Sequence, residues 1–357
     1  MCSRNVVIGG GTGNIGKYLT RKLISDGHNV SLISRKNANM MNWVSSTMNS
    51  KKCPEIIEWK SIEKEGLPLD TDIVINLAGK SIGKIGPWLP SLKDSIMNSR
   101  LNSTKTLAKA IAKSHSPPKV FISASAVGIY ECNPAMTYSE SDAPVREGKE
   151  NFFTSLCQKW EDSAYLPKKD GDGIAGSVYT HVYKESHTRI VNPRFGVVLA
   201  HNTPPMNLLL MSCFAGGSAV LGSGTQPFPW IHIDDTIEVL LTMIKSEELY
   251  GPVNVVAPQI VSNSGFSKAL EDACYTERML PGLPAAIVRL MYGKERADSI
   301  LLDSPKVIPQ KLLDLGFEFK YPDIDSAMRA LVEAECTAKP VLRKVLEAKK
   351  ARSRGNS

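Results

Sequence analysis

The run from Val6 to Lys36, VVIGGGTGNIGKYLTRKLISDGHNVSLISRK, constrains the fold more than any other part of the chain. A short apolar stretch, typical of a buried parallel strand, leads into Gly10, Gly13 and Gly16. The first glycine permits a tight turn, the second lets the backbone approach a pyrophosphate, and the third lets the next helix pack closely. Apolar residues at helical spacing predict that helix over 14–25. Strand, turn, helix and second strand together predict a parallel α/β sheet that binds a dinucleotide.

The phosphates of such a ligand are expected on free backbone N–H groups where the helix begins. The alternative is a glycine turn that binds nothing. The residues predicted to contact the cofactor in this turn are Gly10, Thr12, Gly13, Asn14, Ile15 and Gly16.

The end of the second strand indicates which dinucleotide binds. An NAD site usually places Asp or Glu there, whereas this chain has Ser34, Arg35 and Lys36. A hydroxyl and two cations suit a 2′-phosphate, which Arg can hold bidentately. The sequence therefore favours NADP(H) over NAD, the alternative being a solvated basic turn.

Composition describes an ordinary folded protein of 357 residues, 42% hydrophobic and 22% charged. No window reaches the ~18 apolar residues of a membrane span, and the first strand begins too early for a signal or transit peptide, so a cytoplasmic protein without membrane contact is expected.

Of the net charge of +7, residues 337–357 hold seven Lys or Arg and one Glu. The body is almost neutral, which argues against specific nucleic-acid binding. Seven scattered cysteines and six histidines show neither disulfide nor metal-site spacing.

Further strands and helices follow the first unit. A buried strand at 72–77 runs into Leu77, Ala78 and Gly79, a small-residue turn expected beside the cofactor. A helix is expected over 93–113, with Arg100 as either a ligand contact or a surface cation.

The next strand, 119–123, leads to Ser125 and Tyr130, and a second helix is expected over 151–166. Residues 167–188 read as a surface insertion. Strand residues 189–191 and 195–199 then resume the sheet around Pro193.

These expectations divide the chain into three parts. Residues 1–200 form a doubly wound, NADP-binding α/β domain, residues 201–335 form a small lobe that covers a small-molecule substrate, and residues 336–357 form a basic, mobile tail.

The chain resembles the short-chain dehydrogenase/reductase superfamily in its extended, epimerase-like form. The glycine spacing and N-L-A-G at 76–79 carry that resemblance. More narrowly, the chain is similar to the atypical family 39U on the motifs S-R-K at 34–36, M-N-S-R-L at 97–101, C-Q-K-W-E at 157–161, P-W-I-H-I-D-D at 229–235 and K-V-I-P-Q-K-L at 306–312. The resemblance covers about residues 5–332. It implies a Rossmann-like domain for NADPH, and an NADP-dependent oxidoreductase or a nucleoside-diphosphate-sugar epimerase with cofactor contacts at Ser34, Arg35, Leu77, Ala78, Arg100 and Val198.

The superfamily's Y-x-x-x-K pair is missing. Aligned by Glu161, the second helix puts Phe153 where the Tyr is expected and Cys157 where the Lys is expected. Ser125 matches the superfamily serine, and Tyr130 is a second candidate for proton transfer. Two functions stay open: a reductase or epimerase with a reorganised proton relay, or a decayed enzyme that uses bound NADPH as a sensor or scaffold.

Two further expectations concern the substrate side and assembly. Trp230 and His232 are candidates to line a substrate pocket, but His232 and Asp235 are equally suited to bond a loop and cap a helix beginning near Thr236. The resemblance also implies a possible homodimer, packed through the helices at 93–113 and 151–166.

Overall fold

The computed structural model describes residues 3–35, 53–82, 86–145, 151–165, 187–201, 203–217, 219–279 and 281–355. Lys36 and most of the expected insertion at 167–188 lie outside these ranges. In the described part of the chain, no helix combines the length and the apolar character that a bilayer crossing requires.

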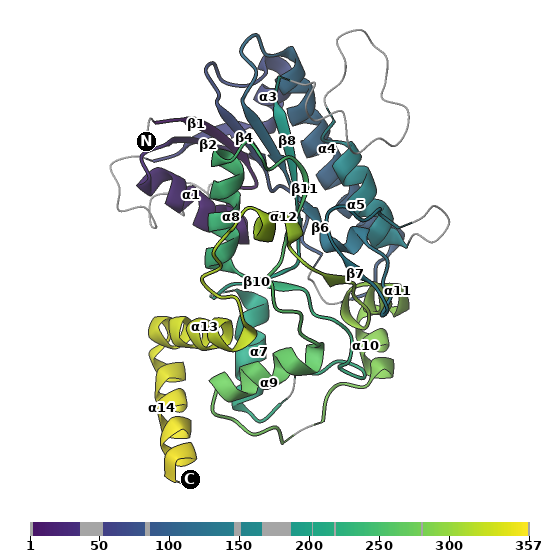
Figure 1. The fold of residues 1–357 in the computed structure, drawn as a ribbon, viewed down its shortest axis with the longest axis vertical. Coiled ribbons are helices and arrows are strands. Elements are labelled where there is room, and N and C mark those ends of the chain that lie inside the picture. Colours follow the sequence, from purple (N-terminus) through teal and green to yellow (C-terminus); the bar gives the residue numbers. More distant parts are fainter. Residues whose placement is uncertain are drawn as a thin grey trace.

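The described residues contain an eight-stranded parallel sheet whose main path runs β11–β8–β5–β4–β1–β2–β3, with β6 beside β8 (Figure 1). This order, with the crossover between β1 and β4, is that of a doubly wound Rossmann-like fold and confirms the predicted fold class. The strands are β1 (Asn5–Gly9), β2 (Asn29–Ser34), β3 (Glu55–Glu58), β4 (Ile73–Asn76), β5 (Val120–Ser123), β6 (Ser125–Ala126), β8 (Arg189–Phe195) and β11 (Gly251–Val255).

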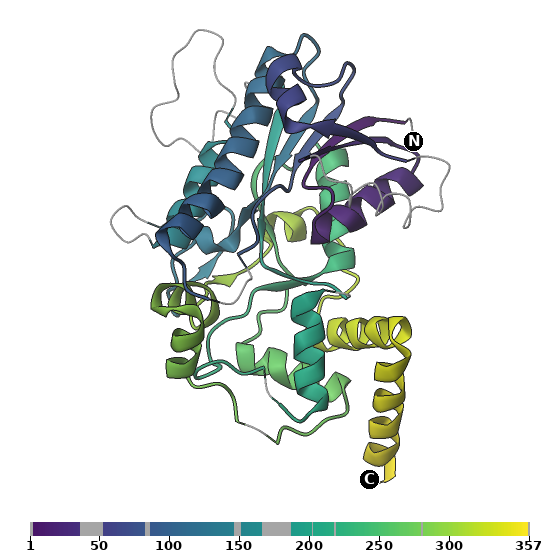
Figure 2. The same ribbon diagram turned by 180° about the vertical axis from the view of Figure 1, so that it is seen from behind.

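Helices cover both faces of this sheet because its strands carry apolar side chains on both sides (Figures 1 and 2). In β1, Val6 and Ile8 pack toward one face and Val7 toward the other. The first face is covered by α1 (Asn14–Ser25) and α8 (Ile233–Lys245), whose leucines meet over Ile75 and Ile122. The second is covered by α3 (Trp59–Glu65), α4 (Pro90–Lys113) and α5 (Phe152–Asp162).

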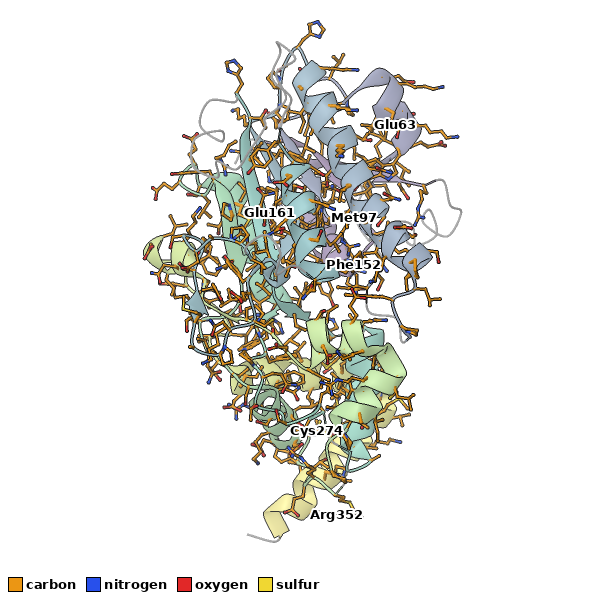
Figure 3. All side chains as sticks on the ribbon, turned by 90° about the vertical axis from the view of Figure 1, so that its right-hand side faces the viewer. Glu63, Met97, Phe152, Glu161, Cys274 and Arg352 are labelled. Atoms are coloured by element: carbon orange, nitrogen blue, oxygen red, sulfur yellow. The ribbon has the colours of Figure 1, made fainter. Side chains whose placement is uncertain are left out.

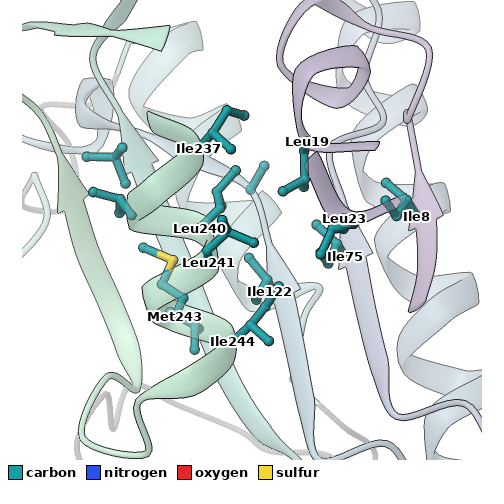
Figure 4. Packing of buried hydrophobic residues seen from close by; sticks show 14 of the residues in the cluster. Ile8, Leu19, Leu23, Ile75, Ile122, Ile237, Leu240, Leu241, Met243 and Ile244 are labelled. Carbon is teal, nitrogen blue, oxygen red and sulfur yellow. The ribbon is translucent and has the colours of Figure 1, made fainter. Parts of the chain in front are cut away.

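Helices α4 and α5 lie side by side, as Figure 3 shows near Met97, Phe152 and Glu161. After its first residue, Pro90, the exposed positions of α4 are polar or charged: Ser91, Asp94, Asn98, Asn102, Lys105, Lys109 and Lys113. The homodimer through these two helices stays a prediction. On the opposite face, Figure 4 shows Leu19 and Leu23 of α1 close to Ile75, and Leu240 and Leu241 of α8 above Ile122.

A second core lies beyond the carboxyl end of the sheet. It joins α7 (Pro204–Phe214), α9 (Asn263–Ala273) and α13 (Ile324–Ala338), with Trp230 fully buried among them. The basic segment at the end of the chain forms α14 (Pro340–Gly355), which packs Leu342 and Leu346 on this core and projects from the body (Figure 1).

Short elements connect the two cores. They are η1 (Val127–Ile129), β7 (Thr137–Tyr138), β9 (Val197–Leu199), β10 (Trp230–His232), α10 (Ala285–Tyr292), α11 (Lys294–Arg296), the π-helical turn η2 (Ala297–Leu301), β12 (Lys306–Val307) and α12 (Gln310–Asp314). Strands β9 and β10 form one parallel pair, and β7 and β12 form another.

The structure corrects two expected boundaries. Residues 189–195 form one strand that runs through Pro193, where an interruption was expected. The proline is tolerated because β5 and β6 pair with β8 at 189–191 and 194–195, leaving Pro193 opposite the break between them. Helix α8 begins at Ile233 instead of near Thr236, because His232 supplies an earlier N-cap.

Candidate functional site

The glycine turn between β1 and α1 has the close contacts that its sequence predicts. Gly10 has a φ of +79°, and a Cβ there would lie 2.6 Å from the Leu77 carbonyl carbon. A Cβ on Gly16 would lie 2.3 Å from the Gly10 oxygen. Both positions exclude a side chain because the turn packs against the end of β4 and α1 packs against the turn.

The start of α1 fits a phosphate group. Gly13 is its N-cap and offers no side chain to the first-turn N–H groups, so the donors at Asn14, Ile15 and Gly16 need an outside acceptor. No acidic residue stands in that first turn. The positive end of the helix is thus left free for an anion, and Thr12 lies half-buried in the turn beside it.

The end of β2 fits a 2′-phosphate. Ile33 pairs with Gly9, so Ser34 and Arg35 follow at the edge where the glycine turn begins. The Ser34 hydroxyl donates to the Arg35 carbonyl oxygen at 3.0 Å, and the Arg35 side chain is exposed. No carboxylate occupies these two positions, where an NAD site would use one.

The turn after β4 leads from the glycine turn toward Arg100. The Leu77 N–H donates to the Gly9 oxygen at 2.8 Å, and the Ala78 N–H donates to Asn76 Oδ1 at 3.1 Å. A Cβ on Gly79 would lie 3.0 Å from Cζ of Arg100. The absence of a side chain at Gly79 therefore makes room for the guanidinium group.

Arg100 is a buried cation, 8% exposed. Its guanidinium lies 4.9 Å from the ring centroid of Trp160, and Nη1 donates to the Lys80 oxygen at 2.9 Å. Burial lowers the pKa of Arg100 to about 10, which leaves it charged at neutral pH. Its Nε–H finds no hydrogen-bond partner among the described residues. A buried donor without an acceptor costs about 1–3 kcal/mol, which a ligand would offset.

A cavity of about 520 Å³ opens beside Arg100 at the carboxyl end of the sheet. Its sheet side includes Ser125, Phe153 and Val197, and its opposite wall is built by η2 and the residues that follow it. Val198, one residue further along β9, packs partly buried against the main core and does not line the cavity. Parallel sheets bind ligands at this edge, and the volume lies in the range of small-molecule pockets.

Ser125 and Tyr130 both line this cavity but differ in what their hydroxyls do. The Ser125 hydroxyl is buried and has no partner within the described residues. The Tyr130 hydroxyl accepts from Nη1 of Arg194 at 2.7 Å and lies 2.9 Å from Oδ1 of Asn254 and 3.0 Å from the Ser139 oxygen. Its single proton is therefore directed to structural acceptors, and burial raises its pKa to about 12.

Two sequence profiles match the chain. Residues 6–153 match the NAD dependent epimerase/dehydratase family, and residues 283–331 match a domain of unknown function, DUF1731. The human epimerase family protein SDR39U1 is 35% identical over 328 residues, which cover 92% of this chain and 99% of the human protein. The chain belongs to this epimerase family. The Bacillus subtilis family member YfhF is 31% identical over 336 residues, with coverage of 92% and 98%. The predicted resemblance to family 39U is confirmed.

Solved structures agree with this membership. The crystal structure of human SDR39U1 (isoform 2) with NADPH has a TM-score of 0.78 and 32% identity, covering 92% of this chain and 99% of that one. A nucleoside-diphosphate sugar epimerase from Corynebacterium glutamicum has a TM-score of 0.63 at 24% identity, covering 99% of this chain and 66% of that chain, and shares the fold.

Within this epimerase fold, Phe153 and Cys157 stand on the buried side of α5. The Phe153 ring packs on Gly128, where a Cβ would lie 2.1 Å from the ring, and it lines the cavity without filling it. Cys157 is fully buried, and burial raises the pKa of its thiol to about 12. Cys157 interacts electrostatically with Arg100 of α4, so a cation stands beside the position expected for the superfamily lysine.

The sequence interpretation missed the ion pair that holds Tyr130. Glu161 of α5 accepts from Nε and Nη2 of Arg194 at 2.8 and 2.9 Å, and the two side chains are 0% and 1% exposed. Burial alone would lower the pKa of Arg194, but Glu161 raises it above its usual value. Arg194, inside a strand expected to be buried in the sheet, was the signal available for a buried partner.

Trp230 and His232 do not line the cavity. Trp230 is 0% exposed in the second core. The His232 ring accepts from the Asp234 N–H at 3.1 Å as the cap of α8, and its centroid lies 4.0 Å from that of Tyr321. Asp235 accepts from the backbone N–H groups of Lys320 and Tyr321. These are the cap and loop contacts given as the alternative, so both substrate-side candidates serve packing in this structure.

Among the described residues, no group of three or more His, Cys, Asp or Glu is arranged to hold a metal ion.

Proposed function

We propose that this chain binds NADPH and reduces the carbonyl group of a small substrate held in the cavity beside Arg100. The observation that carries the proposal is a pair of buried residues, Ser125 and Arg100, that both line one cavity at the carboxyl edge of the sheet and whose Oγ and Nε atoms have no hydrogen-bond partner among the described residues. Unsatisfied buried donors are costly, so a fold that keeps two of them at one cavity is adapted to a ligand.

The preference for NADPH rests on the start of α1 and the end of β2. Asn14, Ile15 and Gly16 present N–H groups to a pyrophosphate, and Ser34 and Arg35 present a hydroxyl and a cation to the 2′-phosphate. The family member SDR39U1 was crystallised with NADPH, which supports the same ligand here.

When bound, NADPH supplies a hydride to the carbonyl carbon. The chain's own part is to stabilise the charge that then develops on the carbonyl oxygen. The Ser125 hydroxyl donates to that oxygen, and the Arg100 guanidinium provides the fixed positive charge that the superfamily lysine would provide. The oxygen takes its proton from water, because Phe153 has none to give and the Tyr130 proton is held by Ser139 and Asn254.

Reduction is favoured over epimerisation by the same residues. Epimerisation through an oxidised intermediate begins by removing a proton from a substrate hydroxyl, which needs a base. Ser125 and Arg100 are donors, and burial raises the pKa of the Cys157 thiol to about 12, which keeps it protonated.

A second function, an NADPH-binding sensor or scaffold, is favoured by the replaced Tyr-x-x-x-Lys pair. Phe153 and Cys157 are packed as ordinary core residues, and Tyr130 is held in a structural network. A sensor needs the dinucleotide site but no reaction at the cavity. The two functions are therefore distinguished by whether a substrate oxidises the bound NADPH.

The experiment has two stages. NADPH and NADH are titrated into the purified protein, with binding followed by cofactor fluorescence. We expect NADPH to bind tighter, and Arg35→Ala to weaken NADPH roughly tenfold to a hundredfold, since a charge-assisted hydrogen bond contributes about 1.5–3 kcal/mol. Lys105→Ala, which removes an exposed cation from α4, is the matched control. Equal affinity for both cofactors contradicts the 2′-phosphate assignment.

In the second stage, NADPH consumption is measured against a panel of aldehydes, ketones and nucleotide sugars. Oxidation of NADPH by any of them supports the reductase. Silence across the panel, with NADPH binding intact, favours the sensor.

A further inference from the structure

The second core contains a cluster of three thiols. Cys213 lies near the end of α7, Cys274 directly follows α9, and Cys336 lies in α13; all three side chains are buried. In Figure 3, Cys274 lies at the same end of the molecule as Arg352 of α14. Three oxidisable groups therefore meet in one core, although they come from segments that are far apart in the sequence.

Cys213 and Cys274 are close enough to react with each other. The Leu270 oxygen of α9 accepts from the Cys274 N–H at 3.0 Å and from Sγ of Cys213 at 3.8 Å, so the two residues meet at one carbonyl group. A hydrogen bond from the Cys274 thiol lowers the pKa of Cys213, and the same bond and burial raise the pKa of Cys274. The thiolate, which is the form that attacks oxidants, is thus favoured at Cys213.

Helix α14 packs beside this pair. Leu342 and Leu346 contact the second core, and the Lys349 ammonium acts on both thiols. Because α14 joins the core through one face, opening this helix locally costs less free energy than unfolding the whole protein. Such opening gives a small molecule access to the thiols of Cys213 and Cys274, which are 3% and 0% exposed.

We propose that Cys213 and Cys274 form a redox-active dithiol, which a hydroperoxide converts to a disulfide when α14 opens. The Cys213 thiolate attacks the hydroxyl oxygen of the hydroperoxide; an S–O bond forms, the O–O bond breaks, and the alcohol leaves with the proton that Cys213 released. The Cys274 thiol then attacks the Cys213 sulfur, which forms the S–S bond and releases water. The two thiols lose two electrons and two protons, and the hydroperoxide is reduced to the alcohol and water. Neither cysteine takes part in the proposed function.

The test treats the full chain with hydrogen peroxide, blocks the remaining thiols in denaturant and maps tryptic peptides by mass spectrometry. Trypsin leaves the three cysteines on separate peptides, residues 195–245, 269–278 and 330–343. We expect a linked pair of the first two peptides, which dithiothreitol separates. Cys336→Ser is the matched control and should keep this pair. In Cys274→Ser, Cys213 should stop at the sulfenic acid and be trapped by dimedone.

The same assay tests access through α14. Leu346→Ala removes a contact between α14 and the core, and it should speed disulfide formation at least about fivefold. Val341→Ala changes a side chain of the same helix that is 74% exposed, and it should leave the rate unchanged.

Two results would overturn the proposal. The absence of a linked pair after prolonged treatment, or a pair that contains peptide 330–343, shows that Cys213 and Cys274 are not the reacting thiols. Equal rates for Leu346→Ala and the wild type show that the oxidant does not enter by the opening of α14.

Discussion

Replacing Glu161 by Gln should destabilise the fold by about 3–5 kcal/mol, because it leaves the Arg194 guanidinium buried without a counter-charge. The two side chains are 0% and 1% exposed and are joined by two hydrogen bonds of 2.8 and 2.9 Å. Water cannot reach the unpaired cation in the variant, so its desolvation cost stays. The loss is a large share of the roughly 5–15 kcal/mol by which domains are stable.

The assay is urea unfolding followed by tryptophan fluorescence. Trp160 is a suitable probe, since it lies beside Glu161 on α5 and donates from Nε1 to the Thr104 hydroxyl at 3.2 Å. With a denaturant slope of about 1–3 kcal/mol per molar urea, the midpoint should fall by roughly 1–5 M.

Two controls separate burial from charge. Glu347→Gln breaks the exposed Arg343–Glu347 pair, 66% and 62% exposed, and should cost less than about 0.5 kcal/mol. The double variant Glu161→Gln/Arg194→Met removes the cation as well and should recover most of the loss. If the free energy of unfolding of Glu161→Gln lies within about 1 kcal/mol of the wild-type value, the claim that water is excluded from this ion pair is refuted.

Two further changes test the cap of α8 and the cavity. His232 stays neutral in the fold because burial lowers its pKa to about 4, whereas the unfolded chain protonates near pH 6.5. The contribution of His232 to the free energy of unfolding is therefore full above about pH 6.5 and falls by up to about 3 kcal/mol as the pH drops to about 4. In urea unfolding measured between about pH 4 and 6.5, His232→Asn should make the free energy of unfolding depend less on pH. An unchanged pH dependence would contradict the assignment. Ser125→Ala should lower the rate of NADPH oxidation about a hundredfold with little effect on NADPH affinity, and an unchanged rate would remove Ser125 from the reaction.

The sequence was most informative where the signal is local. Glycine spacing and helical periodicity predicted the start and end of α1 at Asn14 and Ser25, and the structure has the same bounds. Each contact of that unit joins neighbouring elements, so a short window of residues contains the whole pattern. The cap made by His232 is local too, and it was foreseen as the alternative to a pocket role.

The candidate site could be predicted only in part. Ser125 was identified from its place after a strand, but the hydroxyl of Tyr130 is directed by Arg194, which lies 64 residues away in the chain. The wall of the cavity comes from η2, whose residues show no motif of their own. Such contacts depend on which distant segments meet, and periodicity within one element carries no information about that.

The parallel pair of β7 and β12 has a consequence for the order in which the molecule forms. It brings together two-residue strands at 137–138 and 306–307, and the neighbouring bond from Lys306 to Pro134 spans 172 residues. Closing so long a loop is entropically expensive, so contacts of this kind form late in folding. Strand β1, which leads into the glycine turn, pairs with β2 and β4 from the first 76 residues of the chain, whereas this part of the cavity wall awaits the arrival of the last third of the chain. A nascent chain would therefore gain its phosphate-binding turn before it gained any means of choosing a substrate.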